Sequence, residues 1–100
     1  MTKKEIKELY RSWRKQHKNH HPDRAVVRMY WEDGDNTEKG YQEDIVALEH
    51  FHILSLPPDD HKILFYAGNL KGLLDLMRPD NGSGFVVTDV IEFYRYEYAD

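Results

Sequence analysis

The sequence predicts an α+β fold, in which a basic N-terminal helix and one short helix pack on a small, mainly antiparallel sheet. Two observations support this. Apolar residues recur at helical spacing near the N-terminus and again around residues 70–77, whereas other segments are rich in β-branched and aromatic residues. At 100 residues, the chain is expected to form a single domain, with a basic helix at about 3–18 and an α+β body at about 25–100.

The first helix is predicted from its start signal and from one apolar stripe. Thr2 followed by Glu5 forms a capping box, in which a hydroxyl and a carboxylate satisfy the first free amides of a helix. Four apolar residues then recur at helical spacing: Ile6, Leu9, Tyr10 and Trp13. Asn19 or Pro22 is expected to end the helix.

The middle of the chain predicts strands. Residues 24–32 suit a strand that stops at the turn signal Asp33-Gly34, and an exposed loop is expected as far as residue 40. Residues 41–56 show neither a clean helical spacing nor a clean strand alternation of apolar residues, so a short helix and a strand both remain open. Residues 61–68 predict an apolar strand that Gly68 closes.

The last third predicts a short helix and a C-terminal strand. Asn69 caps a helix that carries four apolar residues at helical spacing and ends before Pro79; these residues are Leu70, Leu73, Leu74 and Met77. Gly72 costs such a helix up to about 1 kcal/mol relative to alanine. Residues 81–84 form a turn, and residues 85–100 supply one long strand or two short ones, with Asp89 as a turn or cap carboxylate.

Charge is unevenly distributed along this small acidic protein. The net charge is −4, yet residues 1–28 hold nine basic residues against three acidic ones, so the remainder carries −10. The N-terminus lacks the apolar core of a signal peptide, and no apolar run approaches the length of a membrane span. With no cysteine for a disulfide framework, we expect a soluble, cytoplasmic protein without membrane contact.

One motif invites a chaperone interpretation. The stretch EIKELYRSWRKQHKNHHPDR resembles the second helix and loop of the J-domain family. That resemblance implies that His21, Pro22 and Asp23 contact a chaperone ATPase. The sequence departs from the family after the motif, where a third helix is needed and a strand is predicted. We therefore interpret the motif as a helix terminus and turn, in which Asp23 bonds to the backbone.

Six histidines raise the question of a metal site. His17 and His21 lie four residues apart, but the helix should fray before Pro22, and the chain contains no HExxH motif. Histidines at the end of a helix also interact with its last carbonyls. No nucleophile motif or phosphate-binding loop is present. We predict no metal, no cofactor, no catalytic residue and no enzymatic activity.

The C-terminal half is similar to the YodL-like group of small domains. The residues that carry the resemblance are FYAGNLKGLLDLMRPDNGSGFVVTDVIEFYRYEYAD, with Val87-Thr88-Asp89-Val90-Ile91 and Tyr98-Ala99-Asp100 at the positions of that group's motifs. The group is associated with mobile elements such as phages, where neighbouring genes often encode counter-defence proteins. The resemblance therefore implies an interaction protein of a mobile element.

Three functions follow as hypotheses. The first is a counter-defence inhibitor, of the anti-CRISPR or antirestriction type, that binds a nucleic-acid-handling enzyme by protein–protein interaction. Its partner-binding residues would be an acidic surface and two aromatic anchors: Glu32, Asp33, Asp35, Glu38, Glu43 and Asp44, with Tyr30 and Trp31. The second is a nucleic-acid-binding accessory protein that uses the basic helix: Lys4, Lys7, Arg11, Arg14, Lys15 and Lys18. The third is the J-domain-like co-chaperone.

Overall fold

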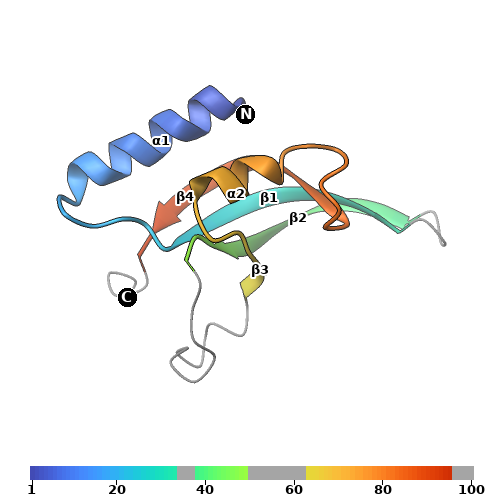
Figure 1. Cartoon of the computed structure of the whole chain (residues 1–100). Coiled ribbons are helices and arrows are strands. Elements are labelled where there is room, and N and C mark those ends of the chain that lie inside the picture. The colour runs from blue at the N-terminus through green and yellow to red at the C-terminus, as the bar shows by residue number, and fades with distance from the viewer. Residues whose placement is uncertain (34–37, 50–62, 96–100) are drawn as a thin grey trace, which may run out of the picture.

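The fold is α+β, as predicted from the sequence. The computed structural model describes residues 1–33, 38–49 and 63–95. The elements in chain order are α1 (Lys3–Gln16), β1 (Arg24–Asp33), β2 (Glu38–Ala47), β3 (Ile63–Tyr66), α2 (Leu70–Asp75) and β4 (Phe85–Tyr94). The strands form one sheet in the order β3-β2-β1-β4. The β1–β2 and β1–β4 pairs are antiparallel and the β2–β3 pair is parallel, so the sheet is mixed (Figure 1).

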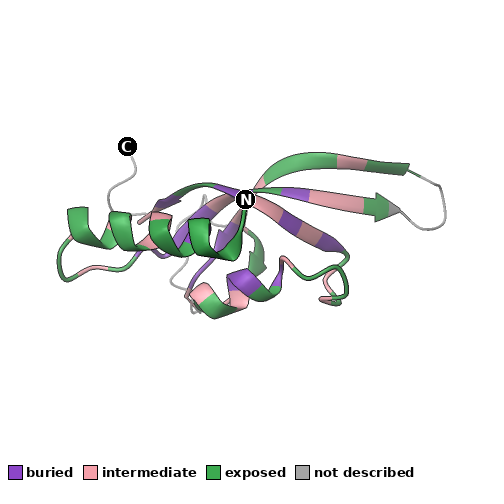
Figure 2. Ribbon diagram, turned by 90° about the horizontal axis from the view of Figure 1, so that it is seen from above, coloured by how far each residue is buried: buried purple, intermediate pink, exposed green. Residues whose placement is uncertain are grey.

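Both helices lie on the same side of the sheet (Figure 2). The core fills the space between the helices and the sheet. The sheet contributes eight side chains to the core from three strands: Ala25, Val27, Met29, Val46, Phe85, Val87, Val90 and Phe93. From the helix side, α1 contributes Ile6, and α2 and the turn after it contribute Leu73, Leu74 and Leu76. Burying each leucine or isoleucine stabilises the fold by about 1.5–3 kcal/mol, so α2 is anchored more firmly than its short length suggests.

The capping box at the start of α1 is confirmed. The Thr2 Oγ1 accepts a hydrogen bond from the Glu5 amide at 3.1 Å, and the Glu5 carboxylate accepts one from the Thr2 amide at 2.9 Å. These bonds lower the pKa of Glu5. The helix ends at Gln16, and Asn19 follows in the left-handed region with φ 69°. Lys18 therefore lies just beyond the helix that was expected to contain it.

The hairpin formed by β1 and β2 is longer than the sequence indicated. β1 confirms the strand predicted at residues 24–32, but β2 begins at Glu38, inside the segment expected to be a loop. The segment that could have been helix or strand is a strand as far as Ala47. The turn signal at Gly34 and residues 50–62 lie outside the described ranges.

Two β-bulges in β4 correct the interpretation of Asp89 as a turn or cap residue. The register against β1 steps from Val87 to Asp89 and again from Val90 to Glu92, which leaves Thr88 and Ile91 as the extra residues. Apolar side chains at spacings of two, three and three residues consequently all face the core: Phe85, Val87, Val90 and Phe93. Strict alternation would have directed Asp89 into that core, so the first bulge keeps a carboxylate out of it.

The outer edge of β4 is occupied by contacts from the same chain. The Val87 amide donates to the Leu76 carbonyl at 2.9 Å. The Asn81 side-chain amide and the Ser83 hydroxyl donate to the Phe85 carbonyl, each at 2.9 Å. Because these groups are already bonded, this end of the edge strand is protected against pairing with another chain.

The His-Pro-Asp motif forms a buried entry into β1, where a helix terminus and turn were predicted. Pro22 and Asp23 are buried, and the Asp23 carboxylate lies 2.8 Å from the Arg24 guanidinium. The Asp23 backbone also bonds to Tyr94 and to Leu48. Residues 24–33 then form β1, at the place where a J-domain requires a third helix, which argues against the co-chaperone alternative.

Candidate nucleic-acid interface and the outer face of the sheet

The cations of α1 line up along one side of the helix. Lys4, Lys7, Arg11 and Arg14 follow one another at intervals of three or four residues, which is the spacing that places side chains on one helix face. Lys15 borders this row, and all five side chains are exposed. The row lies beside the apolar stripe that packs on β4, so packing of the helix fixes the direction in which the cations point. We call these five residues the basic face.

A groove runs between the basic face and α2. It has a volume of about 520 Å³ and is lined by Lys7, Tyr10, Arg11, Arg14, Lys15 and Leu70. The Tyr10 ring is held in place by an edge-on contact with Phe93, with centroids 5.3 Å apart. Burial raises the pKa of the Tyr10 hydroxyl. The groove thus has a cationic wall and a partly apolar floor.

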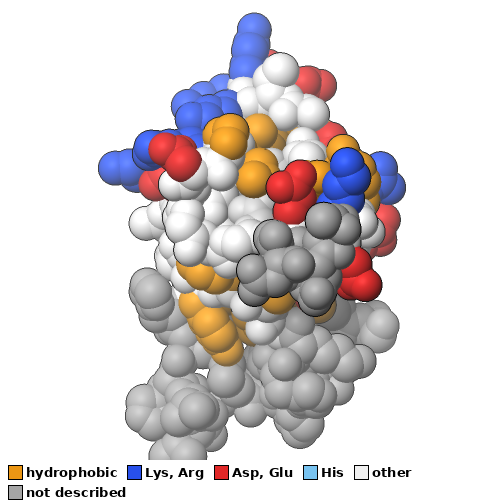
Figure 3. Space-filling model, turned by 90° about the vertical axis from the view of Figure 1, so that its right-hand side faces the viewer, with side chains coloured by type: hydrophobic (Ala, Val, Ile, Leu, Met, Phe, Trp, Pro, Cys, Tyr) orange, Lys and Arg blue, Asp and Glu red, His pale blue; other side chains and the backbone are white. Residues whose placement is uncertain are grey.

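The basic face is electrostatically uncompensated within the described ranges. None of its five cations forms an ion pair there, whereas Arg28, Arg78 and Arg95 each lie within 4 Å of a carboxylate. In Figure 3, Lys and Arg side chains protrude at the top of the molecule with acidic side chains beside them, and charges of both signs also lie lower down. Uncompensated cations on a rigid element can approach phosphate groups without first breaking internal contacts.

The second face of the sheet is not covered by either helix. The register places Arg28, Tyr30 and Glu32 on this outer face, opposite Glu43, Tyr41 and Lys39 of β2. Arg28 and Glu43 form an exposed ion pair at 3.5 Å, and the rings of Tyr30 and Tyr41 lie 5.1 Å apart. Tyr41 is 67% exposed, the highest value among the large apolar side chains described.

Strand alternation separates the two aromatic residues proposed as anchors. Tyr30 lies on the outer face, whereas Trp31 lies on the helix side and packs against the core. The Trp31 ring also rests on Gly40, where an added Cβ would lie 3.4 Å from it. Tyr41, which the sequence reasoning missed, takes the place of Trp31 as the second outer-face aromatic. Tyr41 could have been identified only as the cross-strand partner of Tyr30, and that pairing depends on a strand register that the sequence did not reveal.

The acidic residues are divided in the same way. Glu32 and Glu43 share the outer face, Glu38 is exposed near the end of the hairpin, and Asp44 lies on the opposite side, where it bonds to Gln42. The Asp33 side chain and Asp35 lie outside what the structure describes. The acidic segment is therefore not one flat patch, although the arm from residue 30 to residue 44 has six carboxylates against one lysine, a net charge of −5.

His17, at the end of α1, has a local role. The His17 ring stacks on Trp13 with centroids 4.0 Å apart, and its Nδ1 lies 2.9 Å from the Trp13 carbonyl oxygen. This contact matches the interaction with the last carbonyls of the helix that was considered from the sequence. Across the described residues, no group of three potential metal ligands is close enough to hold an ion. His50, His52 and His61 lie outside those ranges.

No helix in the described ranges is long and apolar enough to cross a membrane. Comparison of the chain with protein-family models, with curated proteins and with solved structures gave no match.

Proposed function

We propose that this protein is a non-enzymatic interaction protein that binds a nucleic-acid-handling enzyme together with its nucleic acid, as a counter-defence inhibitor of a mobile element. The observation that carries this proposal is the uncompensated basic face of α1. In this proposal the basic face contacts the phosphate backbone, and the acidic hairpin contacts the enzyme. The two surfaces belong to different layers of the fold, so both can be engaged at once.

The charge of the basic face sets the strength and the salt dependence of this binding. Five cations that each neutralise one phosphate give a slope of log K against log [salt] of about −4.5 on duplex DNA and about −3.5 on a single strand. The acidic remainder of the chain repels free nucleic acid. Binding to bare nucleic acid should therefore be weak, and an enzyme that supplies a basic surface for the hairpin should strengthen it.

The alternative is an accessory protein that binds nucleic acid through the same helix without an enzyme partner. It uses the same five cations, so mutations in the basic face alone cannot separate the two proposals. The separating variable is whether the enzyme is needed for tight binding.

The test is size-exclusion chromatography of the protein with a CRISPR effector nuclease, with and without guide RNA, at low and high salt. The inhibitor proposal predicts a stable complex that prevents target-DNA binding and weakens in K7Q/R11Q/R14Q. The matched control is K71Q/R78Q/R95Q, which removes the same charge from cations that belong neither to the basic face nor to the acidic hairpin. Absence of a complex, together with salt-sensitive binding of bare RNA or duplex, would replace the inhibitor by the accessory protein.

A further inference from the structure

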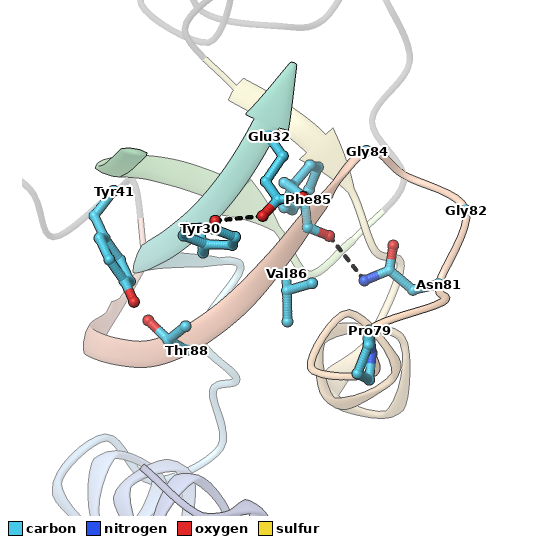
Figure 4. Close-up of a pocket in the computed structure, with 10 residues that line it drawn as sticks. All are labelled: Tyr30, Glu32, Tyr41, Pro79, Asn81, Gly82, Gly84, Phe85, Val86 and Thr88. Atoms are coloured by element: carbon cyan, nitrogen blue, oxygen red, sulfur yellow. Dashed lines mark hydrogen bonds between the residues drawn. The ribbon is translucent and has the colours of Figure 1, made fainter. Parts of the chain in front are cut away.

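A second groove lies on the outer face of the sheet, away from the basic face. Its volume is about 530 Å³, and it runs between the β1–β2 hairpin and the loop after α2. Tyr30, Tyr41, Val86 and Thr88 line it from the sheet, and Pro79 and Asn81 line it from the loop (Figure 4). None of the proposed nucleic-acid contacts uses this groove.

The loop wall of this groove is held in place by hydrogen bonds. The Asn81 Nδ2 lies 2.8–2.9 Å from the carbonyl oxygens of Leu76, Arg78 and Phe85, which share its two N–H donors, and the Asn81 Oδ1 accepts from the Ser83 amide at 2.8 Å. These bonds tie the loop both to the end of α2 and to the start of β4. The groove therefore has two walls that are held in place, the sheet and the loop after α2.

A single carboxylate is positioned at this groove. The Tyr30 hydroxyl donates to a Glu32 carboxylate oxygen at 2.5 Å, which orients the carboxylate beside the tyrosine ring (Figure 4). This hydrogen bond raises the pKa of Tyr30 to about 12. Glu32 has no ion-pair partner among the residues described, although Lys39 lies opposite it on β2. The second carboxylate oxygen is consequently available to an incoming donor.

We propose that this groove binds an arginine side chain on a basic segment of a protein partner. The Glu32 carboxylate matches a guanidinium, whose planar donors recognise carboxylates with defined geometry. The Tyr30 and Tyr41 rings offer faces for cation–π contact, and Val86 and Pro79 offer apolar surface to the aliphatic stem. The net charge of −5 on the surrounding arm attracts a basic segment and repels an acidic one. This inference does not depend on nucleic-acid binding by α1.

The test uses a fluorescent Gly–Arg repeat peptide as the probe and the matching Gly–Lys repeat as the competitor. We expect the arginine peptide to bind more tightly than the lysine peptide of equal charge. E32Q should weaken arginine-peptide binding about tenfold, as expected for loss of a hydrogen bond to a charged group. Y41A should weaken it about two- to fivefold.

The matched control is E92Q, which removes one charge from an exposed side chain of the same sheet that neither lines the groove nor belongs to the acidic hairpin. E92Q should change arginine-peptide affinity by less than about twofold, since only diffuse attraction is lost. Equal losses in E32Q and E92Q, equal affinity for the two peptides, or no peptide binding would each overturn the proposal. Self-association of the protein that E32Q abolishes would also overturn it, because a second copy would then be the occupant.

Two further measurements separate this proposal from the proposed function. K7Q/R11Q/R14Q should bind the arginine peptide as the wild type does, and E32Q should leave binding to bare nucleic acid unchanged. Retention of nucleic-acid binding together with loss of the peptide result would overturn the groove proposal alone.

Discussion

Replacement of Gly72 by alanine should destabilise the protein, although helix propensity alone predicts the reverse. Gly72 lies within α2, and an alanine there would normally stabilise the helix by up to about 1 kcal/mol. A Cβ at this position would lie 2.0 Å from the Ala67 carbonyl oxygen, whereas real Cβ atoms essentially never approach closer than 3.0 Å. The backbone must therefore open by at least about 1 Å.

The Ala67 backbone cannot retreat freely, because its amide donates to the Ala47 carbonyl at 2.8 Å and so fixes it to β2. Overpacking of this kind costs about 1–3 kcal/mol, which exceeds the gain in propensity. We expect Gly72→Ala to lower the free energy of unfolding by about 1–2 kcal/mol, with a fall in Tm of about 4–8 °C per kcal/mol.

Urea unfolding followed by circular dichroism measures this difference, and Lys71→Ala is the control. Lys71 is the exposed neighbour in the same helix, so its replacement should change stability by less than about 0.5 kcal/mol. If Gly72→Ala is as stable as the wild type or more stable, the close approach of α2 to Ala67 is wrong. The position of Leu70, which lines the groove beside the basic face, would then be wrong as well.

Three further changes test other contacts. Ile6→Ala should destabilise the protein by about 2–5 kcal/mol, because Ile6 is the only buried residue of α1; loss of α1 protection in hydrogen exchange is the measurement, and unchanged protection would contradict it. Asn69→Ala should cost about 1 kcal/mol in urea unfolding, because its side chain accepts from the Gly72 amide at 2.8 Å; a smaller effect than that of Lys71→Ala would contradict the cap. Asp89→Asn should be less stable than the wild type at neutral pH, with the difference vanishing in acid. The bond from the Met1 amine lowers the pKa of Asp89, so this stabilisation is present above the unfolded-state pKa and lost as the pH falls through the folded-state pKa; a difference that persists in acid would contradict this.

Local signals in the sequence were sufficient for the helices. The capping box at Thr2 and the cap at Asn69 both act through neighbours within three residues, so nothing distant had to be known. The basic face could be predicted for the same reason, since its spacing is a property of one helix. Only Lys18 fell outside, because the helix ends at Gln16, before the positive φ of Asn19.

Features that depend on strand pairing could not be predicted. The parallel contact of β2 with β3, and the bulges at Thr88 and Ile91, arise from register between segments far apart in the chain. The same limit affected the aromatic anchors, because alternation alone separates Tyr30 from Trp31 but does not identify Tyr41 as a neighbour. The sequence does contain one sign of the bulges, because the apolar residues of β4 recur at spacings of two, three and three rather than at every second residue.

The central claim is that the basic face of α1 contacts nucleic acid. The most direct test is fluorescence anisotropy of a labelled guide RNA in complex with its effector nuclease, titrated with this protein over a range of salt concentrations. We predict that K7Q/R11Q/R14Q reduces the magnitude of the salt slope by about 2 to 3 relative to K71Q/R78Q/R95Q, in proportion to the three phosphate contacts removed. Equal slopes for the two triple variants would show that the basic face makes no phosphate contact, and would contradict the account.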